Sequence, residues 1–141
     1  MPDHANEIVA ALPFNRHVGL SPRPDGKLQM PDDARLLNHV GTVHAGALFA
    51  LGEAASGAAL LDALGAKLAG AVPIVRTARI EFLRPAHGVL VGAGSLDGEA
   101  ALARLVADGK ADVEVGVDLS DELGTVVARV IVTWALRRPR S

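Results

Sequence analysis

Apolar residues dominate one stretch of the chain, residues 43–64, and they show no consistent alternation there. The stretch is rich in Ala and Leu, which favour the helical conformation, and it ends near Gly65. We therefore predict a single long helix over these residues. Because apolar side chains occur all round this helix, it must be buried on nearly every side.

Period-two alternation, which is typical of a strand with one covered face, replaces this pattern after the helix. In residues 75–85, VRTARIEFLRP, the apolar residues Ala78, Ile80 and Phe82 alternate with polar ones. The same alternation is clearest in ADVEVGVDL, where every second residue is Val or Leu. We predict further strands over residues 88–96, 111–119 and 125–137.

The other segments carry shorter patterns. The sequence NEIVAAL predicts a short amphipathic helix over residues 5–11, stopped by Pro13. Two short strands are expected near residues 18–22 and 27–30, with a turn between them. Residues 99–108 fit either a short helix or a broken strand.

The predicted elements form an α+β pattern, in which an antiparallel sheet wraps around one long central helix. The chain has 141 residues, enough for one domain with a real core and too few for two ordinary domains. We therefore expect a single domain over residues 1–141 that carries one functional site.

Composition narrows the range of functions. Fourteen Lys and Arg residues against sixteen Asp and Glu residues give a formal charge of −2, which argues against nucleic-acid binding. The absence of cysteine excludes disulfides, thiolate metal sites and cysteine nucleophiles. Glu53, Ser56 and glycines interrupt residues 45–61, so we expect a buried core helix there and no membrane span. Without a secretory signal pattern, a cytoplasmic location is expected.

Glu53 is a lone carboxylate in the middle of the predicted apolar helix. Burying an ionised carboxylate without partners is costly, so such a group finds donors, takes up a proton or faces a wet cleft. The structural alternative is a solvated side chain at a point where the helix emerges. Both interpretations stay open on the helix pattern alone, because perturbed carboxylates are only statistical markers of function.

His44 lies near the expected start of the helix, where free backbone N–H groups point toward an anion or a carbonyl oxygen. A plain capping or surface histidine is the alternative. Thr42 would also suit the helix cap, and Asn38 would suit hydrogen bonds to the loop backbone. Nine helical residues turn through roughly 900°, which puts His44 and Glu53 on opposite sides of the helix. If both act in catalysis, two chains related by a two-fold axis must share the site.

Asn38, the run GTVH that ends at His44, and Glu53 nine residues later together resemble the signature of hotdog-fold acyl-CoA thioesterases of the PaaI type. FLRPA at residues 82–86 is similar to the segment that these proteins carry in the strand after the helix. The resemblance implies a hotdog fold and hydrolysis of an acyl-CoA thioester to a free acid and CoA. Coenzyme A would be part of the substrate, with no separate cofactor and no metal.

The resemblance also implies a role for each site residue. Glu53 would be the general base or nucleophile, and Asn38 of the partner subunit would position the water. The helix N-terminus at Ala45 and Gly46 would polarise the thioester carbonyl, while His44 would hold the loop and contact the thioester. Ala45 replaces the first glycine of the family's H-G-G, which adds a methyl group where an acyl group would approach. A homodimer or homotetramer is expected.

Beyond the predicted helix, the chain carries four further candidates for substrate binding or catalysis. Arg76, Arg79 and Arg84 would suit the phosphates of coenzyme A, although a solvated strand face explains them equally well. A Ser or Thr often assists from this strand in the family, and Thr77 is the nearest such residue; the alternative is an ordinary strand threonine.

Two other functions remain as alternatives. A non-catalytic acyl-CoA binding or sensing module can use the same fold, because fold does not fix function. The presence of both Asn38 and Glu53 argues against this module, since a binder needs neither a base nor a water-orienting amide, whereas Ala45 argues for it. A hotdog hydratase or dehydratase ranks last, because the Asp-x4-His hydratase pattern is absent around the helix.

Overall fold

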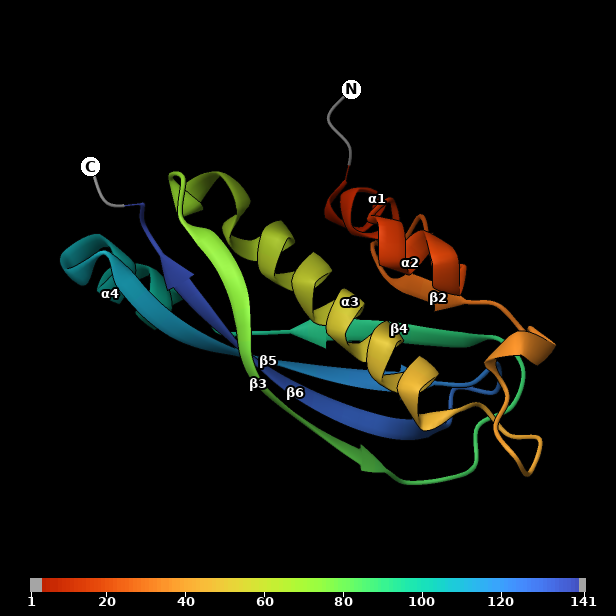
Figure 1. The fold of residues 1–141 in the computed structure, drawn as a ribbon. Coiled ribbons are helices and arrows are strands. Elements are labelled where there is room, and N and C mark those ends of the chain that lie inside the picture. The colour runs from red at the N-terminus through yellow and green to blue at the C-terminus, as the bar shows by residue number, and fades with distance from the viewer. Residues whose placement is uncertain (1–3, 140–141) are drawn as a thin grey trace.

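A six-stranded antiparallel sheet carries a long helix across one face in the computed structural model, which describes residues 4–139 (Figure 1). The order of strands across the sheet is β1-β2-β4-β5-β6-β3. The strands are β1 (Ser21–Pro22), β2 (Leu28–Met30), β3 (Val72–Phe82), β4 (Leu90–Ser95), β5 (Lys110–Ser120) and β6 (Val126–Arg137). The helices are α1 (Ala5–Ala10), α2 (Pro13–Val18), α3 (Ala45–Leu64) and α4 (Glu99–Asp108), with short 3-10 helices at Ala34–Leu36 and Gly65–Leu68.

The predicted long helix is confirmed as α3, and glycines let the sheet approach it closely. A Cβ atom added to Gly52 would lie 2.5 Å from a methyl carbon of Val130 in β6. A Cβ atom added to Gly94 in β4 would lie 2.8 Å from the Cβ of Ala59. Real Cβ atoms do not approach this closely, so glycine is required at these helix–sheet contacts.

The central strands β5 and β6 confirm the predicted alternation. Val115 and Leu119 of β5 are fully buried beneath α3, as are Val130 and Val132 of β6. Charged and small residues of these strands lie on the opposite face of the sheet. This division explains why α3 is apolar all round: the sheet covers one side of it and the N-terminal helices cover another (Figure 1).

Strand β3 lies at the edge of the sheet and pairs only with β6. Its alternation agrees with the prediction, but the expected covered face is only partly covered in a single chain, where Ile80 packs against the core. Ala78 is exposed, and Phe82 is 53% exposed on the same face. The reason is geometric, because α3 lies over the middle of the sheet and leaves this edge strand bare.

The N-terminal segment contains one helix more than predicted. Helix α1 confirms the first, and Pro13 then begins a second helix, α2, as its first residue. Proline is well suited to that position, because the first helical N–H has no intrahelical partner. Helix α1 packs on α3, and the expected strands near residues 18–22 and 27–30 are found as the short pair β1 and β2, although Val18 belongs to α2 and the first strand begins only at Ser21.

The structure also shows the conformation of residues 99–108 and the burial of the most apolar segment. Residues 99–108, for which helix and strand were both open, form the helix α4, which ends at Gly109 in the left-handed conformation. The stretch Ala45–Leu68 is long and apolar enough to cross a membrane by length and composition, since it contains an 18-residue window with a mean hydropathy of 1.4. In this structure 61% of that 18-residue window is buried inside the fold.

Candidate functional site

The start of α3 opens onto a depression of about 380 Å³, which we term the amino-end cleft. The loop before α3 forms one side of it, and the end of β3 with the following residues forms the other. Its lining includes Asn38, Val40, Thr42, Ala45, Leu48, Phe82 and Arg84. Three of the predicted site residues, Asn38, Ala45 and Arg84, therefore lie together here.

Asn38 shapes the loop of this cleft. Its Oδ1 accepts hydrogen bonds from the backbone N–H groups of Val40 and Thr42, both at 3.0 Å. Its Nδ2 donates to the hydroxyl of Thr42 at 2.8 Å. A carboxamide offers two donor hydrogens, so one N–H of Asn38 stays available to a ligand after these bonds.

His44, and not Thr42, is the N-cap of α3. Its Nδ1 accepts a hydrogen bond from the backbone N–H of Gly46 at 2.8 Å. In the neutral ring this bond puts the proton on Nε2, which becomes a donor at the exposed side of the ring. The bond also occupies the N–H of Gly46. Within residues 4–139, the N–H groups of Ala45 and Ala47 have no acceptor, and Ala45 is the one of these two that lines the cleft.

Glu53 lies in a different place, at a pocket of about 170 Å³ that we term the Glu53 pocket. Apart from Glu53 and Asn15, its lining is apolar: Val9, Leu12, Ala54, Gly57, Leu60, Leu61, Pro73 and Trp134. Helices α1 and α2, the middle of α3 and the ends of β3 and β6 supply these residues. The amide of Asn15 donates to the carbonyl of Val9 at 2.9 Å, which fixes α2 against α1.

The Glu53 carboxylate is half-buried, and burial raises its pKa above the ordinary value of 4.5. Desolvation is the cause, because removing water penalises the charged form. A carboxylate with a raised pKa is a stronger base than an ordinary one and suits proton abstraction near neutral pH. Glu53 is therefore neither fully buried nor fully solvated, because part of its side chain stays exposed.

A hydrogen-bonded chain ties this part of α3 to the sheet. The indole N–H of Trp134 donates to the hydroxyl of Ser56 at 3.0 Å, and that hydroxyl donates to the carbonyl of Glu53 at 2.7 Å. Ser56 is fully buried. The helix pattern did not single out Ser56 or Trp134. The available signals were a buried hydroxyl one turn after the carboxylate and the single tryptophan of the chain.

The two pockets lie at different levels of α3. The amino-end cleft includes Ala45 but not Glu53, and the Glu53 pocket includes neither His44 nor Ala45. The amino-end cleft includes Phe82, the last residue of β3, while the Glu53 pocket includes Pro73 near its first residue. The Glu53 carboxylate and the helix start therefore border different pockets of the single chain, and the opposite placement of His44 and Glu53 around the helix stays a prediction.

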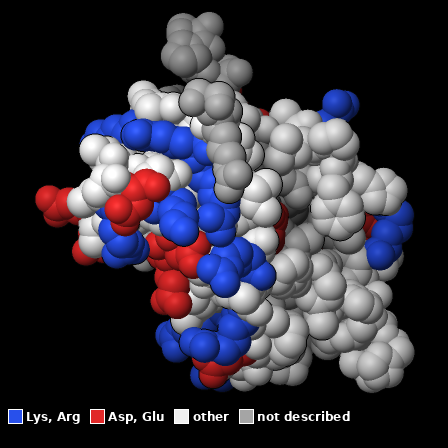
Figure 2. All heavy atoms as spheres, turned by 60° about the vertical axis from the view of Figure 1, so that its left-hand side comes forward, with Lys and Arg blue, Asp and Glu red and all other residues white. Residues whose placement is uncertain are grey.

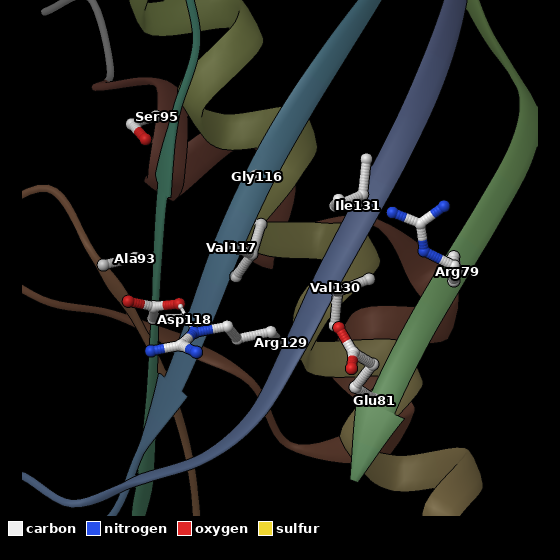
Figure 3. Close-up of a pocket in the computed structure, with 10 residues that line it drawn as sticks. All are labelled: Arg79, Glu81, Ala93, Ser95, Gly116, Val117, Asp118, Arg129, Val130 and Ile131. Atoms are coloured by element: carbon white, nitrogen blue, oxygen red, sulfur yellow. Dashed lines mark hydrogen bonds and ion pairs between the residues drawn. The ribbon is translucent and has the colours of Figure 1, made fainter. Parts of the chain in front are cut away.

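The three candidate arginines do not lie together. Arg84 is at the amino-end cleft, whereas Arg76 forms an ion pair with Asp112. Arg79 extends from β3 on the face of the sheet opposite α3, where Arg129 of β6 pairs with Asp118 of β5 at 3.2 Å (Figure 3). Thr77 is exposed on this opposite face too, where it pairs with Thr133.

Charged residues gather on the side of the molecule shown in Figure 2, with fewer on the right of that view. Near α4 they line a depression of about 320 Å³ formed by Arg76, Arg104, Asp108, Lys110, Ala111, Asp112 and Arg137. Opposite charges are mixed there, and Arg104 also donates to the carbonyl of Asp112. Within residues 4–139, no three His, Cys, Asp or Glu side chains come together as metal ligands.

Comparison with known proteins adds to this geometry. The family described as "Domain of unknown function (DUF4442)" matches residues 16–136. No curated protein sequence matches the chain. The Pseudomonas aeruginosa protein PA5026, described as a probable thioesterase, is 32% identical with a TM-score of 0.81; the match covers 94% of this chain and 93% of that one.

Two further solved structures share the fold. The candidate esterase Rv1847/MT1895 from Mycobacterium tuberculosis is 26% identical, with a TM-score of 0.73 over 92% of this chain and 100% of that one. The BH2602 protein from Bacillus halodurans, solved with CoA, is 21% identical, with a TM-score of 0.64 over 88% of this chain and 76% of that one. The expected sheet around a central helix is thus confirmed as the hotdog fold, and the chain belongs to the DUF4442 family.

Proposed function

We propose that this protein is a thioesterase that hydrolyses acyl-CoA thioesters in a site shared by two subunits, with Glu53 as the base or nucleophile. The observation that carries the proposal is the half-buried Glu53 carboxylate, whose pKa is raised by burial at the mouth of an apolar pocket. The similarity to PA5026, described as a probable thioesterase, supports the same reaction class.

The bare edge of β3 supports a dimer. An edge strand leaves a row of backbone N–H and C=O groups without partners, which a second copy of the strand can pair. Exposed apolar residues on and beside β3 would be covered by the same contact: Val72, Ile74, Phe82 and Leu83. A two-fold axis through such a pair makes the strands antiparallel, so the Pro73 end of one β3 moves toward the Phe82 end of the other.

That antiparallel pairing brings unlike pockets toward each other. Because Pro73 belongs to the Glu53 pocket and Phe82 to the amino-end cleft, the base of one subunit approaches the backbone donors of its partner. The dimer then carries two equivalent sites, each built from both chains. A homotetramer would pair two such dimers without altering the shared site.

The chemistry follows from these groups. Glu53 takes a proton from water, whose oxygen attacks the thioester carbonyl carbon; attack by Glu53 itself, through an anhydride, is the variant. Negative charge develops on the carbonyl oxygen, where the free N–H of Ala45 stabilises it. The carbon–sulfur bond then breaks, and CoA leaves as its thiol after receiving the proton. Asn38 orients the water through its remaining N–H.

Arg84 is the arginine that we assign to a phosphate of coenzyme A, because its side chain borders the cleft in which the thioester carbonyl would lie. The CoA bound to BH2602 supports this ligand class. Arg76 is already paired with Asp112 and Arg79 lies on the opposite face of the sheet, so neither is needed for the reaction.

The test is Glu53→Gln, measured by release of free thiol from a panel of acyl-CoA thioesters. Glutamine keeps the side-chain volume and removes the basic oxygen, so turnover should fall on the order of 10²-fold or more. Thermal unfolding of the same sample checks that the variant is folded. A folded Glu53→Gln protein that turns over its best thioester at the parental rate refutes the enzyme. No turnover by the parent protein, with retained acyl-CoA binding, favours the binding module instead.

A further inference from the structure

We infer that the Glu53 pocket holds the acyl tail of the substrate and selects an unsubstituted apolar tail of about six carbon atoms beyond the carbonyl. The inference rests on the proposed function for the identity of the substrate. The size and polarity of the tail are inferred from the volume and the lining of the pocket.

The position of the pocket fits this role. Glu53 stands in its lining, so a carbonyl carbon within reach of the carboxylate directs the attached tail toward Gly57 and Trp134. The walls come from one chain, because α1 supplies Val9 and Leu12 is the residue that precedes α2. The tail would therefore bind to the subunit that provides the base, whereas the backbone donors come from its partner.

The size of the pocket sets the length of the tail. An apolar protein cavity of about 150 Å³ holds one benzene molecule, which has six carbon atoms. The Glu53 pocket measures about 170 Å³, which corresponds to a tail of nearly the same size. Longer tails must leave part of their apolar surface in water or displace α1 and α2.

The lining also sets the polarity of the tail. Asn15 is the one polar side chain of the lining besides Glu53, and one N–H of its amide is bonded to the carbonyl of Val9. The rest of the lining is apolar, so a hydroxyl or carboxylate at the far end of the tail that is buried against it would lack a partner, which is unfavourable. The pocket therefore discriminates against tails with a polar end.

Trp134 provides a direct measurement of occupancy, since it is the only tryptophan of the chain and lines the pocket. The first probes are 1-alkanols of four to ten carbons, which contain no CoA. The change in Trp134 fluorescence should give affinities that rise about fourfold per methylene until the pocket is full, near six to seven carbons, and then level off. Binding of 1,6-hexanediol should be at least about fivefold weaker than that of 1-hexanol.

Two variants should change, in opposite directions, the chain length at which the affinity levels off. A Cβ atom at Gly57 would lie 3.4 Å from the Trp134 ring, an ordinary contact, so Gly57→Ala should fold and shorten the best tail by about one carbon. Leu12→Ala removes a half-exposed side chain from the wall and should lengthen it. Gly116→Ala is the matched control, because an added Cβ there meets nothing within 4 Å on the opposite face of the sheet.

A second series uses S-alkyl-CoA thioethers, which cannot be hydrolysed, beside a turnover assay of the matching thioesters. Affinities of the alkanols that ignore chain length, or a levelling point that neither variant moves, would overturn the acyl pocket. If the alkanol series behaves as expected while no thioester is hydrolysed, the pocket stands and the proposed thioesterase fails. If both series level off at the same length and turnover follows it, both inferences hold.

Discussion

The amino-end cleft and the Glu53 pocket differ in what each can do to a carbonyl group. The cleft is wide, about 380 Å³, and its lining includes the amide of Asn38 and the free backbone N–H of Ala45 but no carboxylate. The pocket is about 170 Å³, apolar, and offers a desolvated carboxylate with no donor for an oxyanion. In the reaction that we propose, each region supplies groups that the other lacks.

The two regions also owe their properties to different forces. Asn38 donates to Thr42 and accepts from Val40, and His44 accepts from Gly46, so hydrogen bonds fix the loop and the start of α3. Hydrophobic packing of α1 against α3 removes water around Glu53 and raises its pKa. Donor geometry and base strength are therefore set independently, and substitutions can alter one without the other.

The largest effect is expected from Ala45→Pro, which removes a single N–H from the cleft. Ala45 is the first residue of α3, where proline is favoured, and His44 before it is already extended, as a residue preceding proline must be. The helix should therefore persist while the oxyanion loses its donor. Turnover should fall about 10²- to 10³-fold, as measured by thiol release.

Ala45→Val is the control for this substitution, because it adds similar bulk and keeps the N–H. Its turnover should stay within about tenfold of the parent, since only the approach of the acyl group is crowded. Equal losses in the Pro and Val variants would show that bulk at this position, and not the N–H, affects the rate.

A second prediction concerns the dimer that joins the two regions. Ala78 is exposed on the α3-facing side of β3, so Ala78→Asp would put an unpartnered carboxylate into the contact from both subunits. The dissociation constant should rise on the order of 10²-fold, as measured by analytical ultracentrifugation, with parallel loss of turnover. Leu123→Asp, in a turn where the residue is 91% exposed, should leave both unchanged. A fully active Ala78→Asp monomer would contradict the shared site.

Mixing two inactive variants tests the sharing directly. In a heterodimer of Ala45→Pro and Glu53→Gln chains, one site carries both defects and the other carries neither. Random exchange should then restore about a quarter of the parental turnover per chain, because half of the dimers have one intact site. Exchange can be followed by mass spectrometry. Exchange without recovery would mean that both residues act within one chain.

Sequence patterns predicted the framework well because α3 is a long run of apolar, helix-favouring residues and β3, β5 and β6 alternate strongly, and the alternation of β5 alone indicated which face is buried. The second N-terminal helix escaped prediction, since Pro13 both ends one helical segment and begins the next. Burial of Glu53 could not be deduced from its neighbours in sequence, because the apolar cover comes from residues about 40 and 80 positions away, Val9 and Trp134. The role of Gly46 also changed, since its N–H is bonded to His44.

The smallest expected effect is the pH dependence that Glu53 gives to the free energy of unfolding of the protein. Burial raises the pKa of Glu53 in the folded protein above the 4.5 of an ordinary glutamate, so between these two values the folded state holds more protons than the unfolded state. Stability from this protonation is fully present below about pH 4.5 and is lost as the pH rises through the folded pKa. Glu53→Gln does not titrate, so its stability relative to the parent should increase over that interval and then stay constant.

Urea unfolding of both proteins at a series of pH values measures this difference. Glu53→Ala is the control: it also lacks the titrating group, so its difference from the parent should have the same pH dependence with a constant offset from lost packing. Turnover by the parent should rise through the same pH interval, because only the ionised carboxylate acts as a base. If the two differences are flat with pH, Glu53 is not desolvated in solution, and the contrast between the apolar pocket and the polar cleft no longer explains how this chain produces a base.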